Sequence, residues 1–272
     1  KATSRFICKP CFWLALILSG LPTANCFSQT LNWAQKASSE ATDYSRAVAV
    51  DAAGNVYITG YFEGRATFGE KMLTCIASSD IFLVKYDASG KFQWVQQAGG
   101  NGYDFGNGIS ADPAGNIYIT GYFEGKAFFD KKAKTPFTKK DPGGSKTITS
   151  IASSDLFIAK YNPAGSLLWV QQARGNVKDY GNSISVDASG NVYATRQTPG
   201  TATFGAGSVS NLRGTDIFIT KFSPSGQLQW LQQAGGIGYT HGNGIIVDHS
   251  GNVFVTGYFE GTATVGDTSL TS

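Results

Sequence analysis

The sequence predicts an all-β fold built from a repeated four-stranded antiparallel unit, and three features of its 272 residues predict it. The stretch DAAGNVYITGYFEG at residues 51–64 returns almost unchanged as DPAGNIYITGYFEG at residues 112–125. Short runs rich in Val, Ile, Tyr, Phe and Trp alternate with turn residues throughout. Glycine is frequent, with 34 residues, which suits many short strands joined by tight turns.

The repeat has a long and nearly constant period. The dipeptide Gly-Asn recurs with spacings of 61, 75 and 61 residues, and tryptophan recurs with the same spacings at Trp33, Trp94, Trp169 and Trp230. The longer middle unit contains a Lys-rich insertion at residues 130–146, which a surface loop absorbs at little cost. A period of this length indicates an array of structural units. The predicted units span about residues 31–98, 99–173, 174–234 and, in part, 235–272.

Each strand of the first unit follows from its residues. Residues 46–51, 55–62, 80–87 and 92–98 are rich in β-branched and aromatic residues and too short for helices. The first two strands are joined by Asp-x-x-Gly, and the last two by Asp, Asn or Ser followed by Gly three residues later. This is the pattern of a type I turn. The tight turns therefore lie at one end of the strands, and the longer, variable connections lie at the other.

A four-stranded antiparallel unit of about 61 residues predicts a β-propeller blade. Residues 81–84 are apolar on both faces, as a strand between packed layers should be, whereas the coils of a β-solenoid are shorter and lack paired hairpin turns. Three full blades are expected at about residues 47–98, 108–173 and 183–234. Residues 31–37 resemble a fourth strand, and the last unit lacks its third. We therefore expect an incomplete arc of blades, truncated at the C-terminus.

The repeated pattern D-x-x-G-N-[VI]-Y-[IA]-T-G, followed by D-[IL]-F-[ILV]-x-K-[YF] and G-x-[FL]-x-W, resembles a known family. It is similar to the SBBP, or seven-bladed β-propeller, repeat of secreted bacterial proteins, over nearly all of residues 31–272. The resemblance implies an extracellular or cell-surface propeller that is often part of a longer chain with further domains. The family has no established catalytic residues, so the resemblance transfers none.

Residues 1–28 are predicted to be a secretory signal peptide. Lys1, Arg5 and Lys9 precede an apolar run that is too short to span a bilayer, and Cys26 and Ser28 are small residues suited to cleavage after Ser28. A lipoprotein anchored at Cys26 is the alternative. The propeller domain at residues 29–272 then has 19 basic and 19 acidic residues, which gives no reason to expect nucleic-acid binding. It contains no transmembrane segment and a single cysteine, so no internal disulfide is expected.

The motif YFEG is the strongest candidate for function, because units one, two and four contain it and unit three has RQTPG at residues 196–200 instead. It begins a connection on the variable loop face, together with acidic residues of the crossovers between blades. A ring beside a carboxylate suits a glycan, peptide or matrix partner. A solvated Glu beside a strand-end aromatic is the structural alternative. The predicted ligand-binding residues are Tyr61, Glu63, Tyr122, Glu124, Tyr258, Glu260, Asp43, Asp104 and Asp179.

Catalytic and metal sites have less support in the sequence. The only histidines, His241 and His249, have no partner at metal-ligand spacing, and neither belongs to a Ser-His-Asp arrangement. Each turn offers a single aspartate, so calcium is only an alternative and no cofactor is expected. Glu63 and Glu124 on adjacent blades could form a pair of acids, which leaves a secreted polysaccharide hydrolase or lyase as the alternative function. The leading hypothesis is a secreted, non-enzymatic binding or scaffold module.

Overall fold

The computed structural model describes residues 32–39, 41–129, 146–151, 153–198, 200–204, 207–210 and 213–272, and these residues form strands and turns only. Trp33–Ser272 forms one compact unit. The predicted signal peptide and nearly all of the insertion at residues 130–146 lie outside the described residues. None of the described segments is a helix of the length and apolarity needed to cross a membrane.

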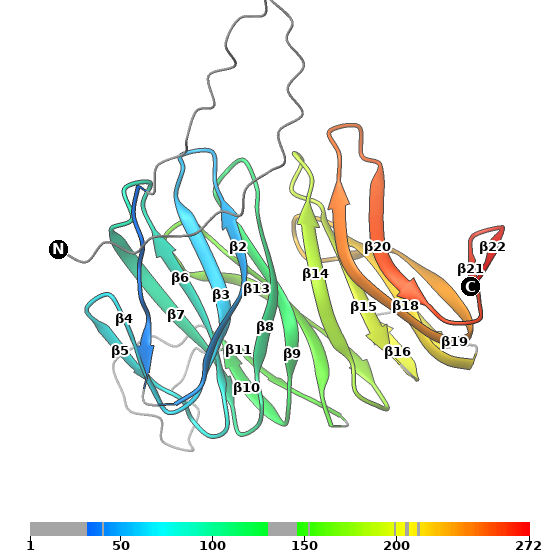
Figure 1. The fold of residues 1–272 in the computed structure, drawn as a ribbon, viewed down its shortest axis with the longest axis horizontal. Helices are drawn as coiled ribbons and strands as arrows, with labels where there is room; N and C mark the ends of the chain where they lie inside the picture. The colour runs from blue at the N-terminus through cyan, green and yellow to red at the C-terminus, as the bar shows by residue number, and fades with distance from the viewer. Residues whose placement is uncertain are drawn as a thin grey trace, which may run out of the picture. The chain divides into compact units, whose positions relative to one another are not determined.

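Three complete four-stranded antiparallel blades are present among the described residues, as predicted (Figure 1). The first, innermost strands are β2 (Asp43–Val50), β8 (Phe105–Ala111), β14 (Tyr180–Val186) and the C-terminal part of β19 (Leu228–Val247). The second strands are β3 (Val56–Phe62), β9 (Ile117–Phe123), β15 (Val192–Thr198) and β20 (Val253–Phe259). The third strands are β6 (Asp80–Tyr86), β12 (Asp155–Tyr161) and β18 (Arg213–Phe222). The fourth strands are β7 (Phe92–Gly100), β13 (Leu167–Gly175) and the N-terminal part of β19.

The tight turns have the predicted chemistry. In the first turn the amide of Gly54 donates to the carbonyl of Asp51 at 3.0 Å, the contact that closes a type I turn. The Asp51 carboxylate accepts hydrogen bonds from the amides of Ala53 and Asn55, and from the Tyr57 hydroxyl at 2.9 Å. The recurring Asp, Asn and Tyr are therefore one hydrogen-bonded unit, and both carboxylate oxygens of Asp51 already have protein partners.

The connection after the second strand differs from the expected variable loop. It begins at Gly64, Gly125 and Gly261, whose φ values of 63°, 66° and 75° favour glycine, and it forms a short hairpin. The first hairpin strand pairs with the fourth strand of the preceding blade, as Phe128 does with Gly99 and Ala127 with Gly100. The hairpins are β4 (Arg65–Phe68) with β5 (Lys71–Thr74), β10 (Lys126–Phe129) with β11 (Lys146–Thr149), β16 (Thr201–Phe204) with β17 (Gly207–Ser210), and β21 (Thr262–Val265) with β22 (Thr268–Thr271).

Two further differences from the expected strand pattern occur at the edges of the repeat. Residues 32–37 do not form the expected fourth strand, but β1 (Ser38–Ser39) still pairs with the β4 hairpin strand in the usual register. Before the last unit, β19 runs through the crossover as one strand of 20 residues. Its ladder with β18 continues through Gly214 and Thr215 by way of several register shifts, which lets both strands extend beyond the normal blade.

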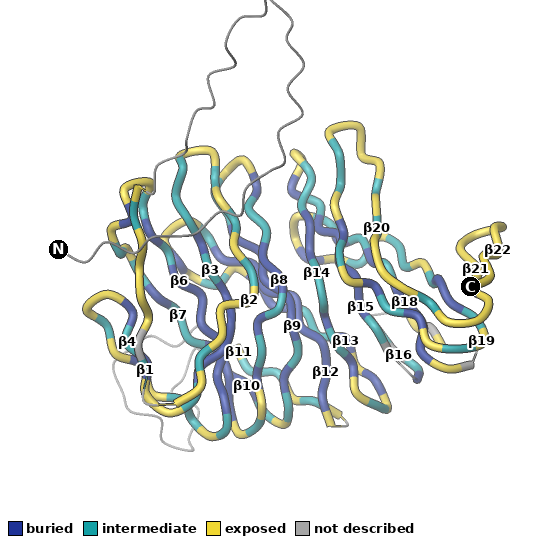
Figure 2. Tube along the Cα trace, in the orientation of Figure 1, coloured by how far each residue is buried: buried dark blue, intermediate teal, exposed yellow. Residues whose placement is uncertain are grey.

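The core lies between blades, and tryptophans and lysines connect them. Buried residues concentrate in the second and third strands, as the dark segments of Figure 2 show. The indole of Trp94 donates to the carbonyl of Pro163, in a turn of the next blade, at 3.2 Å. Lys160 is only 8% exposed; its ammonium group donates to Pro224 at 3.2 Å and lies 4.9 Å from the Tyr118 ring centre. These residues are therefore structural, and the sequence alone did not reveal the role of the lysines.

Candidate binding site on the inner strands

Aromatic side chains from the first and second strands form a continuous row across adjacent blades. The ring centres of Tyr44 and Tyr61 are 5.3 Å apart, and Tyr61 lies 4.2 Å from Phe105 of the next blade. Phe105 lies 4.8 Å from Tyr122, which in turn lies 4.8 Å from Tyr180 of the third blade. Two of the predicted tyrosines, Tyr61 and Tyr122, are therefore brought together by rings that the prediction did not include.

The predicted Tyr258 belongs to a similar ring pair in the last unit. Its ring stacks on His241, with centres 4.5 Å apart and an angle of 10° between the planes. His241 also contacts Gln197, with 3.0 Å between His241 Nε2 and Gln197 Nε2. Gln197 is the third unit's counterpart of Tyr61 and Tyr122. An amide therefore continues the row where unit three lacks the aromatic residue.

A pocket of about 490 Å³ opens beside this row. Four of its residues occupy one repeated position of the first strand, which is Arg46 in the first unit and asparagine in the others. The side chains of Asn107 and Asn182 donate to backbone carbonyls of the following inner strand, at 2.9 and 2.8 Å. These bonds hold adjacent inner strands together. The lining residues are Arg46, Asn107, Tyr122, Tyr180, Asn182, Gln197, His241 and Asn243.

The pocket is polar and aromatic, and no carboxylate is among its lining residues. The Arg46 guanidinium lies 5.5 Å from the Tyr61 ring centre and 6.0 Å from that of Tyr44, close enough for cation–π attraction. Burial lowers the pKa of His241, with Glu260 acting in the opposite direction. Burial also raises the pKa of the Tyr122 hydroxyl to about 12. Arg46 is therefore the one side chain among the lining residues that is permanently charged.

Two of the predicted acids lie in a different environment from the one expected. Asp104 and Asp179 are fully buried at the junctions between blades, whereas the prediction placed them on the loop face. Asp104 accepts hydrogen bonds from the amides of Gly100 at 2.7 Å and Glu124 at 3.3 Å. Burial, together with the charge of Asp80, raises its pKa well above the usual value. The physical reason for the difference is that the hairpins pair with the preceding blade and so cover the crossovers.

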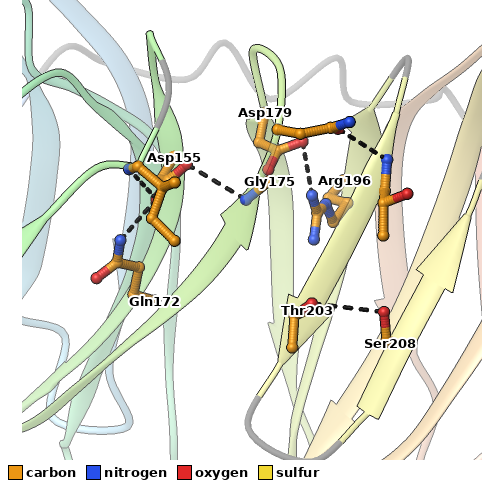
Figure 3. Close-up of polar contacts among 10 residues, drawn as sticks. Asp155, Gln172, Gly175, Asp179, Arg196, Thr203 and Ser208 are labelled. Atoms are coloured by element: carbon orange, nitrogen blue, oxygen red, sulfur yellow. Dashed lines mark hydrogen bonds and ion pairs between the residues drawn. The ribbon is translucent and has the colours of Figure 1, made fainter.

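In the third unit, Asp179 forms a buried ion pair with Arg196 (Figure 3). The distance between Arg196 Nη2 and Asp179 Oδ1 is 2.6 Å, and the two side chains are 1% and 0% exposed. Arg196 stands where the other units have Gly60, Gly121 and Gly257. The replacement of this glycine, the residue just before YFEG, therefore has a structural cause: the arginine pairs with the buried acid at this junction.

The remaining predicted acids do not form a shared site among the described residues. Glu63 and Glu124 are half-buried, Glu260 is exposed, and none of the three lines the pocket. Asp43 is half-buried at the start of β2. The described part of the chain also has no cluster of three His, Cys, Asp or Glu residues that could hold a metal ion. The first strands contain a second repeated Gly-Asn, distinct from that of the turns, in FGNG, YGNS and HGNG. This repeat was the sequence signal that could have identified the pocket.

Comparisons with known proteins agree with this geometry. A profile described as the SBBP β-propeller repeat matches residues 33–61, 93–122 and 229–258. The chain is also 24% identical over 262 residues to an uncharacterized WD repeat-containing protein of Acanthamoeba polyphaga mimivirus. That alignment covers 84% of this chain but 19% of the viral protein. The chain therefore carries SBBP repeats at three positions and is a β-propeller repeat protein.

Proposed function

We propose that the protein is a secreted or cell-surface binding module without a catalytic role, and that it holds a glycan in the pocket between its inner strands. The observation that carries this proposal is the composition of the lining, in which amides and aromatic rings surround about 490 Å³. A concave site with rings and a few fixed polar groups is typical of small-ligand recognition. The signal-peptide pattern of residues 1–28 supports export.

The polar groups of the pocket match hydroxyl groups of a sugar. Asn107 and Asn182 each use one amide N–H to bond the next strand, which leaves an oxygen and a second N–H for a ligand. Tyr122 and Tyr180 contribute aromatic carbons that suit the apolar C–H groups of a sugar, and hydroxyls that both donate and accept. Arg46 adds a cation that favours an acidic sugar over a basic one. The preferred ligand is therefore an acidic oligosaccharide.

The alternative of a polysaccharide hydrolase or lyase lacks a supporting observation. Glycoside hydrolysis commonly uses two carboxyl groups on either side of the scissile bond. The predicted pair, Glu63 and Glu124, is not part of the pocket lining. A binding role needs no such pair, and the rings and amides are sufficient for it.

The proposal is tested by screening the protein against neutral and acidic oligosaccharides and measuring affinities by calorimetry. Tyr122→Ala should weaken binding about tenfold, or about 1.4 kcal/mol. Arg46→Asn, which introduces the residue of the other units, should remove the preference for acidic ligands while keeping the framework. Tyr239→Ala is the matched control, because Tyr239 is 58% exposed and lies outside the pocket lining.

Three results would count against the proposal. Binding that survives Tyr122→Ala and Arg46→Asn but is lost in Glu63→Ala, Glu124→Ala or Glu260→Ala would place the site on the hairpin connections. Binding of peptides but of no oligosaccharide would change the ligand class. Turnover of a polysaccharide that is lost on one carboxylate substitution would replace the binding role with the hydrolase or lyase alternative.

A further inference from the structure

His241 differs from the other residues of the pocket lining because its charge can change near neutral pH. The rest of the lining consists of amides, two tyrosines and Arg46. Amides do not titrate, tyrosine hydroxyls ordinarily lose their protons at about pH 10, and arginine keeps its charge. Histidine ordinarily titrates at about pH 6.5. Between about pH 5 and 8 the charge of the lining therefore depends on His241.

The contact between His241 and Gln197 indicates which form of the ring the pocket contains. Nε2 of His241 lies 3.0 Å from Nε2 of Gln197. The NH2 group of an amide only donates hydrogen bonds, so the ring nitrogen accepts one. A ring nitrogen accepts only when it carries no proton. The ring in this contact is therefore neutral, with its single proton on Nδ1.

The surroundings of the ring also favour its neutral form in the free protein. The ring is half-buried and stacks on Tyr258, with centres 4.5 Å apart. Burial lowers the pKa of His241, and the negative charge of Glu260 acts in the opposite direction. The carboxylate of an acidic ligand in the pocket acts in the same direction as Glu260. A ligand can therefore tip the ring toward its charged form.

The other titratable or charged groups on the elements around the ring do not replace this effect. Arg196 is already paired with Asp179, and the buried Asp216 accepts a hydrogen bond from Gln233 at 2.5 Å. Arg46 is itself a cation, so it attracts the ligand rather than the proton. The groups concerned are Arg46 on β2, Tyr122 on β9, Tyr180 on β14, Arg196 on β15, Asp216 on β18, and Tyr258 and Glu260 at β20.

Protonation changes what this pair of side chains presents to a ligand. With a proton on both ring nitrogens, His241 Nε2 and the Gln197 NH2 group are two donors that face each other. The conflict is removed when the Gln197 amide turns over, so that its oxygen accepts from Nε2. Among the described residues, no protein group accepts a hydrogen bond from His241 Nδ1. The Nδ1–H of the charged ring is therefore left for a ligand.

We propose that His241 determines specificity as a second cation of the pocket, whose protonation strengthens the binding of an acidic oligosaccharide. This inference rests on the proposed function and adds the condition under which the ligand is held. A carboxylate that accepts a hydrogen bond from a charged ring makes a stronger contact than one that meets a neutral ring. Since the bound carboxylate favours the charged ring, binding takes up a proton. Affinity therefore rises as the pH falls below about 6.5.

The experiment uses the intact protein and two matched probes, a trimer of galacturonic acid and its uncharged methyl ester. Carboxyl groups ordinarily titrate at about pH 4, so the acid trimer keeps its charge between pH 5 and 7.5. In calorimetry, its affinity should be about tenfold greater at pH 5 than at pH 7.5, whereas that of the ester should not change. Titrations at pH 6 in buffers of different ionisation enthalpy should show proton uptake with the acid trimer.

Variants of the two histidines identify the group that titrates. His241→Phe introduces the residue of unit two at this position, Phe105, and should abolish both the proton uptake and the affinity ratio between pH 5 and 7.5. His249→Ala is the matched control, because His249 is exposed, belongs to a tight turn and lies outside the lining. Glu260→Gln removes a charge that raises the pKa of His241, so it should move the change in affinity to lower pH.

The outcomes separate this inference from the proposed function. Equal affinity for the acid trimer at the two pH values, or a pH dependence that survives His241→Phe, would overturn the inference and leave the binding role in place. The same dependence for the methyl ester would also overturn it, since a carboxylate would not be the cause. Failure of the acid trimer to bind at pH 5 would overturn it as well. The proposed function fails only if neutral sugars are not bound either.

Discussion

Replacing Arg196 with glycine is expected to destabilise the protein by about 3–5 kcal/mol at neutral pH, the typical cost of removing one partner of a buried ion pair. The guanidinium is 1% exposed and lies 2.6 Å from Asp179. Glycine is the appropriate substitute because it occupies this position at residues 60, 121 and 257. The change leaves the Asp155 and Asp179 carboxylates buried without the arginine charge.

The same junction allows a double-mutant cycle with substitutions taken from the chain itself. The last unit has Thr240 at the position of Asp179, together with Gly257 at the position of Arg196. Asp179→Thr alone should also be costly, because it leaves the buried arginine without this carboxylate. The double variant, which reproduces the residues of the last unit, should cost clearly less than the sum of the two single changes.

The cost of Arg196→Gly should also depend on pH. Burial already raises the pKa of Asp155, and Arg196 acts to lower it. Removal of the arginine therefore raises this pKa further, so the folded state retains a proton that the unfolded state has lost. Between the unfolded and folded pKa values, stability then falls by about 1.4 kcal/mol for each unit of rising pH. The stability of the variant should therefore be closer to that of the native protein at pH 5 than at pH 8.

The measurement is urea unfolding followed by tryptophan fluorescence at pH 5, 7 and 8, with extrapolation to water. Lys178→Ala is the control, since it removes an exposed cation near the junction and should change stability by less than about 0.5 kcal/mol. A cost below about 1 kcal/mol for Arg196→Gly would refute the reasoning. So would a double variant whose cost equals the sum of the single costs.

Three further changes test the connections within and between blades. Asp187→Ala should cost about 1–3 kcal/mol at pH 7, because the carboxylate accepts turn hydrogen bonds that outweigh the effect of burial and hold its pKa below the usual value. A lowered pKa stabilises the folded protein only above the pKa of the unfolded chain. The difference in unfolding free energy between this variant and the native protein should therefore shrink below about pH 4 in denaturation experiments. Trp94→Phe removes the bond to Pro163 and should cost about 1 kcal/mol by calorimetry; no change would show that the bond contributes nothing. Lys160→Met keeps most of the apolar stem and loses the bond to Pro224, so a cost of about 1.5–3 kcal/mol is expected in urea unfolding, and increased stability would contradict it.

Much of the blade follows from local sequence. Alternating apolar residues and turn residues predicted the four strands of the first unit, which the structure confirms as β2, β3, β6 and β7 with ends shifted by a few residues. The Asp-x-x-Gly pattern predicted the tight turns because the aspartate, the glycine and the residues that they contact are within a few positions of one another. The predicted tyrosines Tyr61 and Tyr122 do lie in one aromatic row.

The sequence by itself determined the repeat, the strands and the turns, since these depend on neighbouring residues and on a period that is visible in the chain. Only the tertiary structure decided that the hairpins after YFEG pair with the preceding blade and that Asp104 and Asp179 are buried beneath them. The pocket likewise depends on Arg46, Asn107, Asn182 and Asn243, which come from four different units. The hairpin contacts join residues 27 and 29 positions apart, and the pocket joins residues 61 or more positions apart. Their geometry depends on how the blades stack against one another, which no local sequence pattern contains.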